Sequence, residues 1–129
     1  MMYLIQCVNA YMAIRALEEC ECEYQTAHSL IALKHRLQPH VDFFIKNEMK
    51  LVEEYARREE DGKITITENG GFAFLDPAMA NEYAKRRTEL SMVLVEEEIP
   101  VLHAPAPKTI RPVHLEALSG FLDFGGEGA

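Results

Sequence analysis

The longest regular pattern of apolar positions runs from about Thr26 to Glu60 and repeats every seven residues. The centre of this stripe is formed by Leu30, Leu37, Phe44 and Leu51, and it is flanked by Ile31, Ile45, Val52, Ala27, Val41 and Tyr55. A stripe of this width is typical of the buried face of an amphipathic helix. A helix of about 35 residues would be about 52 Å long, which exceeds the width of a compact domain of this size. We therefore expect different elements to cover its two halves.

Pro39 lies inside this pattern. Proline removes one backbone hydrogen bond from a helix and clashes with the preceding turn. The seven-residue period continues in phase on both sides of Pro39, which argues against a reversal of the chain. The sequence therefore predicts one kinked helix with the halves Thr26–Gln38 and Pro39–Glu60.

A β-hairpin is predicted directly after the long helix. The segment Lys63–Thr67 alternates polar and apolar residues, and Phe72–Leu75 follows as the return strand. Between them, Glu68-Asn69-Gly70-Gly71 supplies the glycines that a tight turn needs for positive φ angles.

A second helix is predicted after this hairpin. Asp76 is a good N-cap, and Pro77 suits the first helical position, so we expect a helix from Pro77 to about Leu94. Its length of about 27 Å matches the second half of the long helix. The economical packing is an antiparallel pair of helices joined by the hairpin.

The two ends of the chain are expected to cover the first half of the long helix. The sequence predicts a short strand over Met2–Val8, a helix from Asn9 to near Glu19, a second strand over Val95–Leu102 that pairs with the first, and a last helix that starts at Pro112. Ala104–Pro107 contains two prolines and is expected to be an extended connector.

These elements predict one α+β domain over residues 1–124 that is mostly helical. We expect a kinked antiparallel helical hairpin with a β-hairpin at its tip and a small terminal subdomain made of a short strand pair and two short helices. The last five residues, 125–129, are glycine-rich and are expected to form a flexible tail. The total length of 129 residues suits a single domain.

The charge balance limits the kinds of partner that the chain is expected to bind. The chain has 21 acidic and 13 basic residues and a formal net charge of −8. This sign argues against a general nucleic-acid binder, which needs clustered cations. The sequence shows no secretory signal and no run of about 20 apolar residues, and its three cysteines suit a reducing compartment. We therefore expect a cytoplasmic protein with a protein partner and without a membrane span.

Two groups of residues could carry chemistry, and neither has a recognised pattern. Cys20 and Cys22 precede His28 and His35, but the two histidines would lie about 10 Å apart along a helix, too far to share one ion. Cys7 could act as a nucleophile if it met His103 or His114, yet no glycines of a nucleophile elbow surround it. We therefore expect no catalytic residue, no cofactor and no metal.

Several stretches resemble a known family. They are Asn9-Ala10-Tyr11-x-Ala13-x-Arg15-x-Leu17, Thr26-Ala27-x-x-Leu30-x-x-Leu33-Lys34 leading to Leu37-x-Pro39, Glu53-Glu54-Tyr55, Asp61-Gly62-Lys63-Ile64 and Leu115-x-x-Leu118-x-x-Phe121-Leu122-x-Phe124. Together they resemble a family of small uncharacterised proteins encoded by tailed phages and prophages of Gram-positive bacteria. The resemblance implies a non-enzymatic role in virion assembly or in dealing with the host, in the cytoplasm of a bacterial host or on the virion. It carries over no catalytic residue.

The candidate interaction surface is the apolar side of the predicted hairpin. Ile64 and Ile66 share one face of the first strand, and Phe72 and Phe74 share one face of the second. A two-stranded hairpin is marginally stable alone, so this face should be covered by a second copy or by another protein. We expect a protein-interaction protein, an accessory or assembly factor that forms a homo-oligomer. The alternatives are an acidic inhibitor of a host defence or nucleic-acid-processing enzyme, and a small enzyme that uses Cys7 and a histidine.

Overall fold

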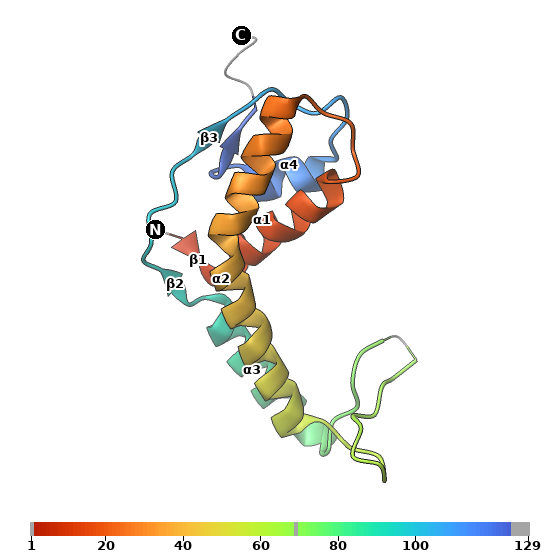
Figure 1. Ribbon diagram of the computed structural model, residues 1–129. Coiled ribbons are helices and arrows are strands. Elements are labelled where there is room, and N and C mark those ends of the chain that lie inside the picture. Colours follow the sequence, from red (N-terminus) through yellow and green to blue (C-terminus); the bar gives the residue numbers. More distant parts are fainter. Residues whose placement is uncertain (1, 69, 125–129) are drawn as a thin grey trace.

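The chain folds into a rounded head and a projecting arm (Figure 1). The structure is a computed structural model and describes residues 2–68 and 70–124. Its helices are α1 (Leu4–Leu17), α2 (Tyr24–Tyr55), the 3₁₀ turn η1 (Pro77–Met79), α3 (Ala80–Ser91) and α4 (Pro112–Leu118). Its strands are β1 (Met2–Tyr3), β2 (Leu94–Val95), β3 (Leu102–His103) and β4 (Leu122–Asp123). This arrangement confirms the predicted mostly helical α+β fold. The predicted tail at 125–129 lies outside the described residues.

The long helix α2 belongs to both parts of the molecule. It continues without interruption through Pro39, and Figure 1 shows that it changes direction partway along its length, in agreement with the expected kink. Its buried residues follow the predicted stripe and include Leu30, Leu37, Phe44 and Leu51. The helix ends at Tyr55 and not at Glu60, because the backbone becomes extended at Ala56 and enters the tip of the arm.

In the head, α1 packs against both α2 and α4. The prediction of a strand over Met2–Val8 is wrong, since the strand covers only Met2–Tyr3 and α1 begins at Leu4. The early start places Leu4 and Cys7 on the same buried face as Ala10. The side chain of Gln6 accepts a hydrogen bond of 2.7 Å from the backbone N–H of Tyr3 and so caps the first turn. Burial of this face overrides the local β propensity.

Two short strand pairs complete the head. As predicted, the N-terminal strand pairs with the segment after α3, and Met2 opposes Val95 in an antiparallel ladder. The continuous strand predicted over Val95–Leu102 is wrong, because β2 ends at Val95. Instead, Leu102 opposes Leu122 in a parallel pair of β3 and β4. The last helix starts at Pro112 as predicted, but α4 ends at Leu118 and Gly120 turns the chain with a φ angle of 94°, so that Leu122 lies in a strand.

Thr26 links the long helix to the connector between β3 and α4. The expected start of the long helix at Thr26 is two residues late, since α2 starts at Tyr24 and Thr26 lies fully buried inside the helix. Its hydroxyl donates a hydrogen bond of 2.5 Å to the backbone carbonyl of Pro105. Proline has no backbone N–H, so the segment around Pro105 can donate few hydrogen bonds of its own. The hydrogen bond that its carbonyl accepts from Thr26 therefore helps to anchor this segment.

The buried hydroxyl of Thr26 yields a stability prediction. Replacement Thr26→Val keeps the shape of the side chain but leaves the Pro105 carbonyl unsatisfied, so we expect a loss of about 1–3 kcal/mol in the free energy of unfolding. Urea denaturation followed by circular dichroism measures this loss. The matched variant Thr26→Ser keeps the hydroxyl and should lose less. Equal stability of Thr26→Val and the original chain would contradict the proposed anchor.

Candidate functional site

The arm consists of the second half of α2 and the returning segment η1–α3, which run antiparallel (Figure 1). The expected helix start is confirmed, since the Asp76 carboxylate accepts a hydrogen bond of 3.0 Å from the N–H of Ala78. None of the 12 residues of α3 is buried. The two helices are connected by polar contacts, with Arg87 to Glu48 at 2.9 Å and Arg86 to Glu54 at 2.7 Å. The arm is thus a thin two-helix structure whose surfaces are largely accessible.

The tip, residues 56–75, contains three extended segments. The predicted hairpin is present, with Ile66 opposite Phe72, but a third segment that follows α2 completes it. This segment pairs with both strands of the hairpin, because Ala56 opposes Phe74 and Arg58 opposes Ile64. Each of the three segments therefore pairs with the other two.

A cycle of three backbone hydrogen bonds lies at the centre of the tip. The N–H of Arg57 donates to Ala73 at 2.7 Å, Ala73 donates to Thr65 at 2.9 Å, and Thr65 donates to Arg57 at 2.9 Å. Sequence reasoning missed this closure. The available signal was the regular spacing of the turn sequences Asp61-Gly62 and Asn69-Gly70, which lie eight residues apart.

The turns that connect the segments share one hydrogen-bond pattern. In the first, Glu59 donates to Lys63 and Gly62 donates back to Glu59. In the second, Thr67 donates to Gly71 and Gly70 donates back to Thr67. Gly62 and Gly70 both have a φ angle of 86°, the left-handed region that favours glycine. This is the pattern of a three-residue hairpin loop with glycine at its last position.

The predicted interaction residues separate into a covered and an exposed group. Phe72 and Phe74 are half-buried, and their ring centroids lie 5.1 and 5.5 Å from that of Tyr83 on α3. Ile64 is also half-buried, whereas Ile66 is 63% exposed. Helix α3 thus covers the aromatic part of the hairpin face and leaves the isoleucine end accessible. Leu75, which the sequence interpretation did not select, is 66% exposed.

Tyr83 joins the tip to the end of α2. Its ring also lies 5.9 Å from that of Tyr55, whose hydroxyl donates to Glu82 at 2.9 Å. Burial raises the pKa of Tyr83, the nearby Glu48 carboxylate raises it further, and Arg87 opposes both effects. The phenol therefore stays uncharged at neutral pH, which suits its position among other rings.

Cys7 lies in a position that protects its thiol. It is fully buried on α1, and its Sγ donates to the sulfur of Met2 at 3.6 Å. Burial raises the pKa of Cys7 from 9.0 to about 11, with a smaller contribution from the negative charge of Glu97. His103 instead forms an exposed contact of 3.2 Å with Asp123. The arrangement keeps the Cys7 thiol protonated, the opposite of what a nucleophile requires.

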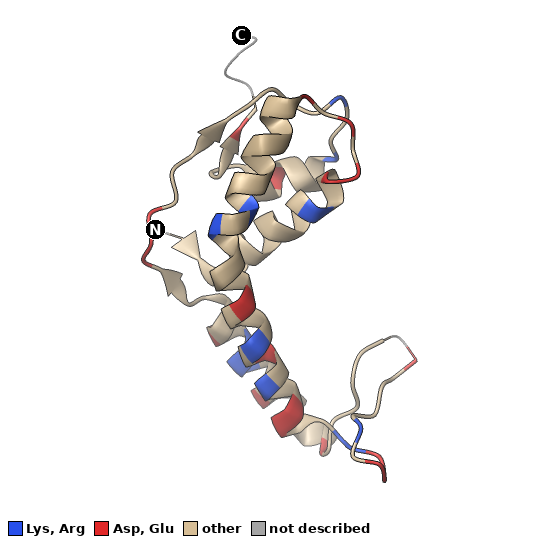
Figure 2. Ribbon diagram, viewed as in Figure 1, with Lys and Arg blue, Asp and Glu red and all other residues tan. Residues whose placement is uncertain are grey.

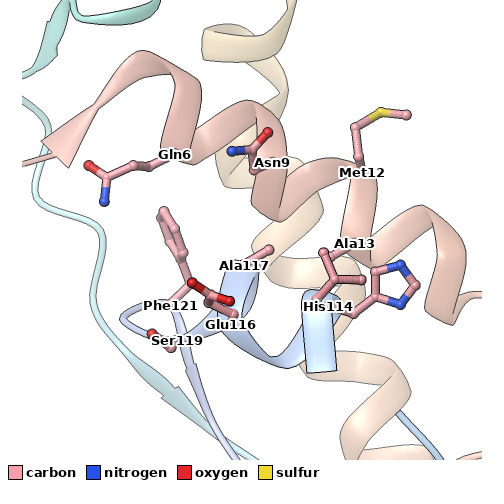
Figure 3. Close-up of a pocket in the computed structure, with 10 residues that line it drawn as sticks. Gln6, Asn9, Met12, Ala13, His114, Glu116, Ala117, Ser119 and Phe121 are labelled. Atoms are coloured by element: carbon pink, nitrogen blue, oxygen red, sulfur yellow. The ribbon is translucent and has the colours of Figure 1, made fainter. Parts of the chain in front are cut away.

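A groove of about 860 Å³ lies between α1 and α4 (Figure 3). Its polar side chains do not converge, since Gln6 and His114 lie at opposite ends in this view. Cys20 and Cys22 line a separate depression of about 320 Å³, while His28 and His35 are exposed on α2. Within residues 2–68 and 70–124, no three His, Cys, Asp or Glu side chains are placed to hold a metal ion.

Comparisons with protein-family models, curated proteins and solved structures found no match to this chain. In the described part of the chain, no helix is both long enough and apolar enough to cross a membrane. The residues of this chain favour the arm and its tip as the candidate site.

The raised pKa of Cys7 predicts a pH-dependent stability. In the unfolded chain the thiol ionises near pH 9.0, whereas in the folded chain it stays protonated to about pH 11. The native state is therefore favoured below pH 9 and loses this advantage as the pH rises toward 11. We expect the stability difference between the original chain and Cys7→Ala to shrink by about 2 kcal/mol between pH 8 and 10.5. Urea titrations at a series of pH values measure it, and a constant difference would contradict the raised pKa.

The left-handed turn at Gly62 predicts a local effect in the tip. In Gly62→Ala the added methyl group meets no atom within 4 Å, but the backbone angle is strained, so we expect a loss of about 1 kcal/mol. Hydrogen exchange should become faster at the amides of Arg57 and Thr65 and stay unchanged in α1. Gly62→Asn is the matched control, because asparagine tolerates this backbone region better. Unchanged exchange in Gly62→Ala would count against a strained turn.

Proposed function

We propose that this chain is a non-enzymatic protein-interaction protein of phage or prophage origin, an accessory or assembly factor that docks a protein partner on the tip of its arm. The observation that carries the proposal is the projection of the tip away from the head by two antiparallel helices (Figure 1). The origin rests on the resemblance of its caps and core positions to small phage proteins.

The construction of the tip supports a docking role. The cycle of backbone hydrogen bonds and the Tyr83 cluster fix the backbone around Ile66 before any partner arrives. A preorganised surface loses little conformational entropy on binding. The exposed side chains of Ile66 and Leu75 supply the apolar contact area that such a partner would cover.

The distribution of charge supports docking over nucleic-acid mimicry. Figure 2 shows Lys and Arg together with Asp and Glu along the arm. Mimicry of a phosphate backbone needs carboxylates along one face, whereas the arm carries both signs and pairs several of them internally, such as Arg86 with Glu54. The buried and protonated Cys7 likewise favours an interaction protein over a cysteine enzyme.

Affinity capture from phage-infected host cells tests the proposal with three forms of the chain. We expect the original chain to recover a capsid or tail component, and Ile66→Glu to lose it, because a carboxylate at a covered apolar site is costly to desolvate. The matched control is Ile31→Glu, which changes a 52% exposed isoleucine on the head and should retain capture.

Two results would contradict the proposal. Recovery of a nuclease or polymerase would favour an inhibitor of a host enzyme. Recovery that is equal for Ile66→Glu and the original chain would remove the tip as the docking surface.

A further inference from the structure

The chain exposes more surface than a compact monomer of its mass. Its accessible surface is 8841 Å² for 14.7 kDa. Folded monomers of this mass expose about 6,900 Å². The excess of roughly 1,900 Å² is more than twice the roughly 800 Å² that one partner contributes to a standard interface. The arm contributes to this excess, since α3 buries none of its residues.

One side of α2 in the arm has the spacing of a helix–helix seam. Asp42, Ile45, Met49 and Val52 follow one another at intervals of three, four and three residues. Ile45 and Met49 are each 52% exposed, and Val52 is half-buried. Alternating intervals of three and four residues keep side chains in line along a pair of helices. We refer to Ile45, Met49 and Val52 as the flank.

Contacts with α3 use a neighbouring row of α2 and leave the flank accessible. The α3 side of α2 carries Glu48, which pairs with Arg87, and Phe44, whose ring lies beneath the Arg87 guanidinium at 5.8 Å. The charges on this side are therefore neutralised within the chain.

Besides Asp42, two further charged residues, Lys46 and Glu53, border the flank, and they differ from the paired charges on the α3 side. Lys46 and Glu53 are exposed and form no ion pair within the described residues. They lie seven residues apart on the same line of the helix. If two copies of α2 lay antiparallel along their flanks, Lys46 of each copy would face Glu53 of the other. The symmetric contact would then contain two ion pairs, each between Lys46 of one copy and Glu53 of the other.

We propose that a second copy of this chain docks on the flank, α2 against α2 in antiparallel orientation, and turns two two-helix arms into a four-helix bundle. Met49 of one copy then lies beside Val52 of the other in the apolar centre. The proposal concerns the flank and not the tip, so it goes beyond the docking function proposed above.

Self-complementarity favours a second copy over an unrelated helix. A two-fold contact uses the same patch on both chains, so each charge must find its opposite at the symmetry-related position. Lys46 and Glu53 meet this condition in the antiparallel orientation. In a parallel pair, the two Lys46 side chains would lie at the same level and so would the two Glu53 side chains.

Charge reversal tests both the contact and its direction. Sedimentation equilibrium should show a dimer for the original chain. Lys46→Glu places two like-charged pairs in the contact, and so does Glu53→Lys, so we expect each to raise the dimer Kd at least about tenfold. An equimolar mixture of these two variants should form a heterodimer, because every facing pair is then opposite in sign. The double variant with both reversals should dimerise like the original chain.

Lys85→Glu is the matched control, since Lys85 is an exposed lysine on α3 and does not belong to the α2 helix that carries the flank. It should leave the dimer unchanged, and circular dichroism should show that every variant is folded. A strictly monomeric original chain at high concentration would overturn the proposal. A dimer whose Kd is unchanged by the charge reversals would also overturn the proposal and place the contact elsewhere. A dimer that is lost in Ile66→Glu and not in the charge-reversal variants would overturn it as well and place the contact at the tip. Capture of a partner by the tip is measured separately, so either proposal can fail alone.

Discussion

The length of α2 is the constraint on which the rest of the structure depends. Its 32 residues extend about 48 Å, and the chain has too few other residues to enclose a helix of that length in one core. The remaining elements therefore divide between its halves. α1 and β3 lie beside the first half and α4 packs against α1, whereas within the described residues α3 is the helix that packs along the second half. Head and arm are consequences of this division.

The two halves are stabilised by different interactions. In the head, small residues such as Ala10 and Ala13 are buried, which allows α1 to lie close to its neighbours around Ile14 and Leu33. In the arm, exposed ion pairs such as Arg86 with Glu54 bridge the helices, and pairs of this kind contribute little in water. Apolar packing at the end of the arm comes chiefly from the rings around Tyr83. The head is therefore the more stable part, and the arm would gain more stability than the head if a partner covered its exposed surface.

Sequence patterns predicted the elements that depend on local signals. The apolar period predicted α2, Pro39 predicted the change of direction partway along it, Asp76-Pro77 predicted the helix start, and the glycines predicted the hairpin turn. Features that depend on distant partners were missed. The pairing of Leu102 with Leu122 needs two segments that have no shared local pattern, and the start of α1 at Leu4 depends on burial against the head. For the candidate site, the turn signals predicted the hairpin, and its pairing of Ile66 with Phe72 is present, but the cover that Tyr83 provides could not be inferred from spacing alone.

The cycle of hydrogen bonds in the tip also decides how it can recognise other molecules. Both the N–H and the C=O of Arg57, Thr65 and Ala73 are used inside the cycle. Three mutually antiparallel segments cannot lie in one flat sheet, so the central residues present no open edge to an incoming strand. The centre of this hairpin therefore cannot bind a partner by strand addition, a mode of recognition that is common for exposed β-hairpins. Specificity must come from side chains, and the backbone geometry that displays them also protects the tip from edge-to-edge aggregation.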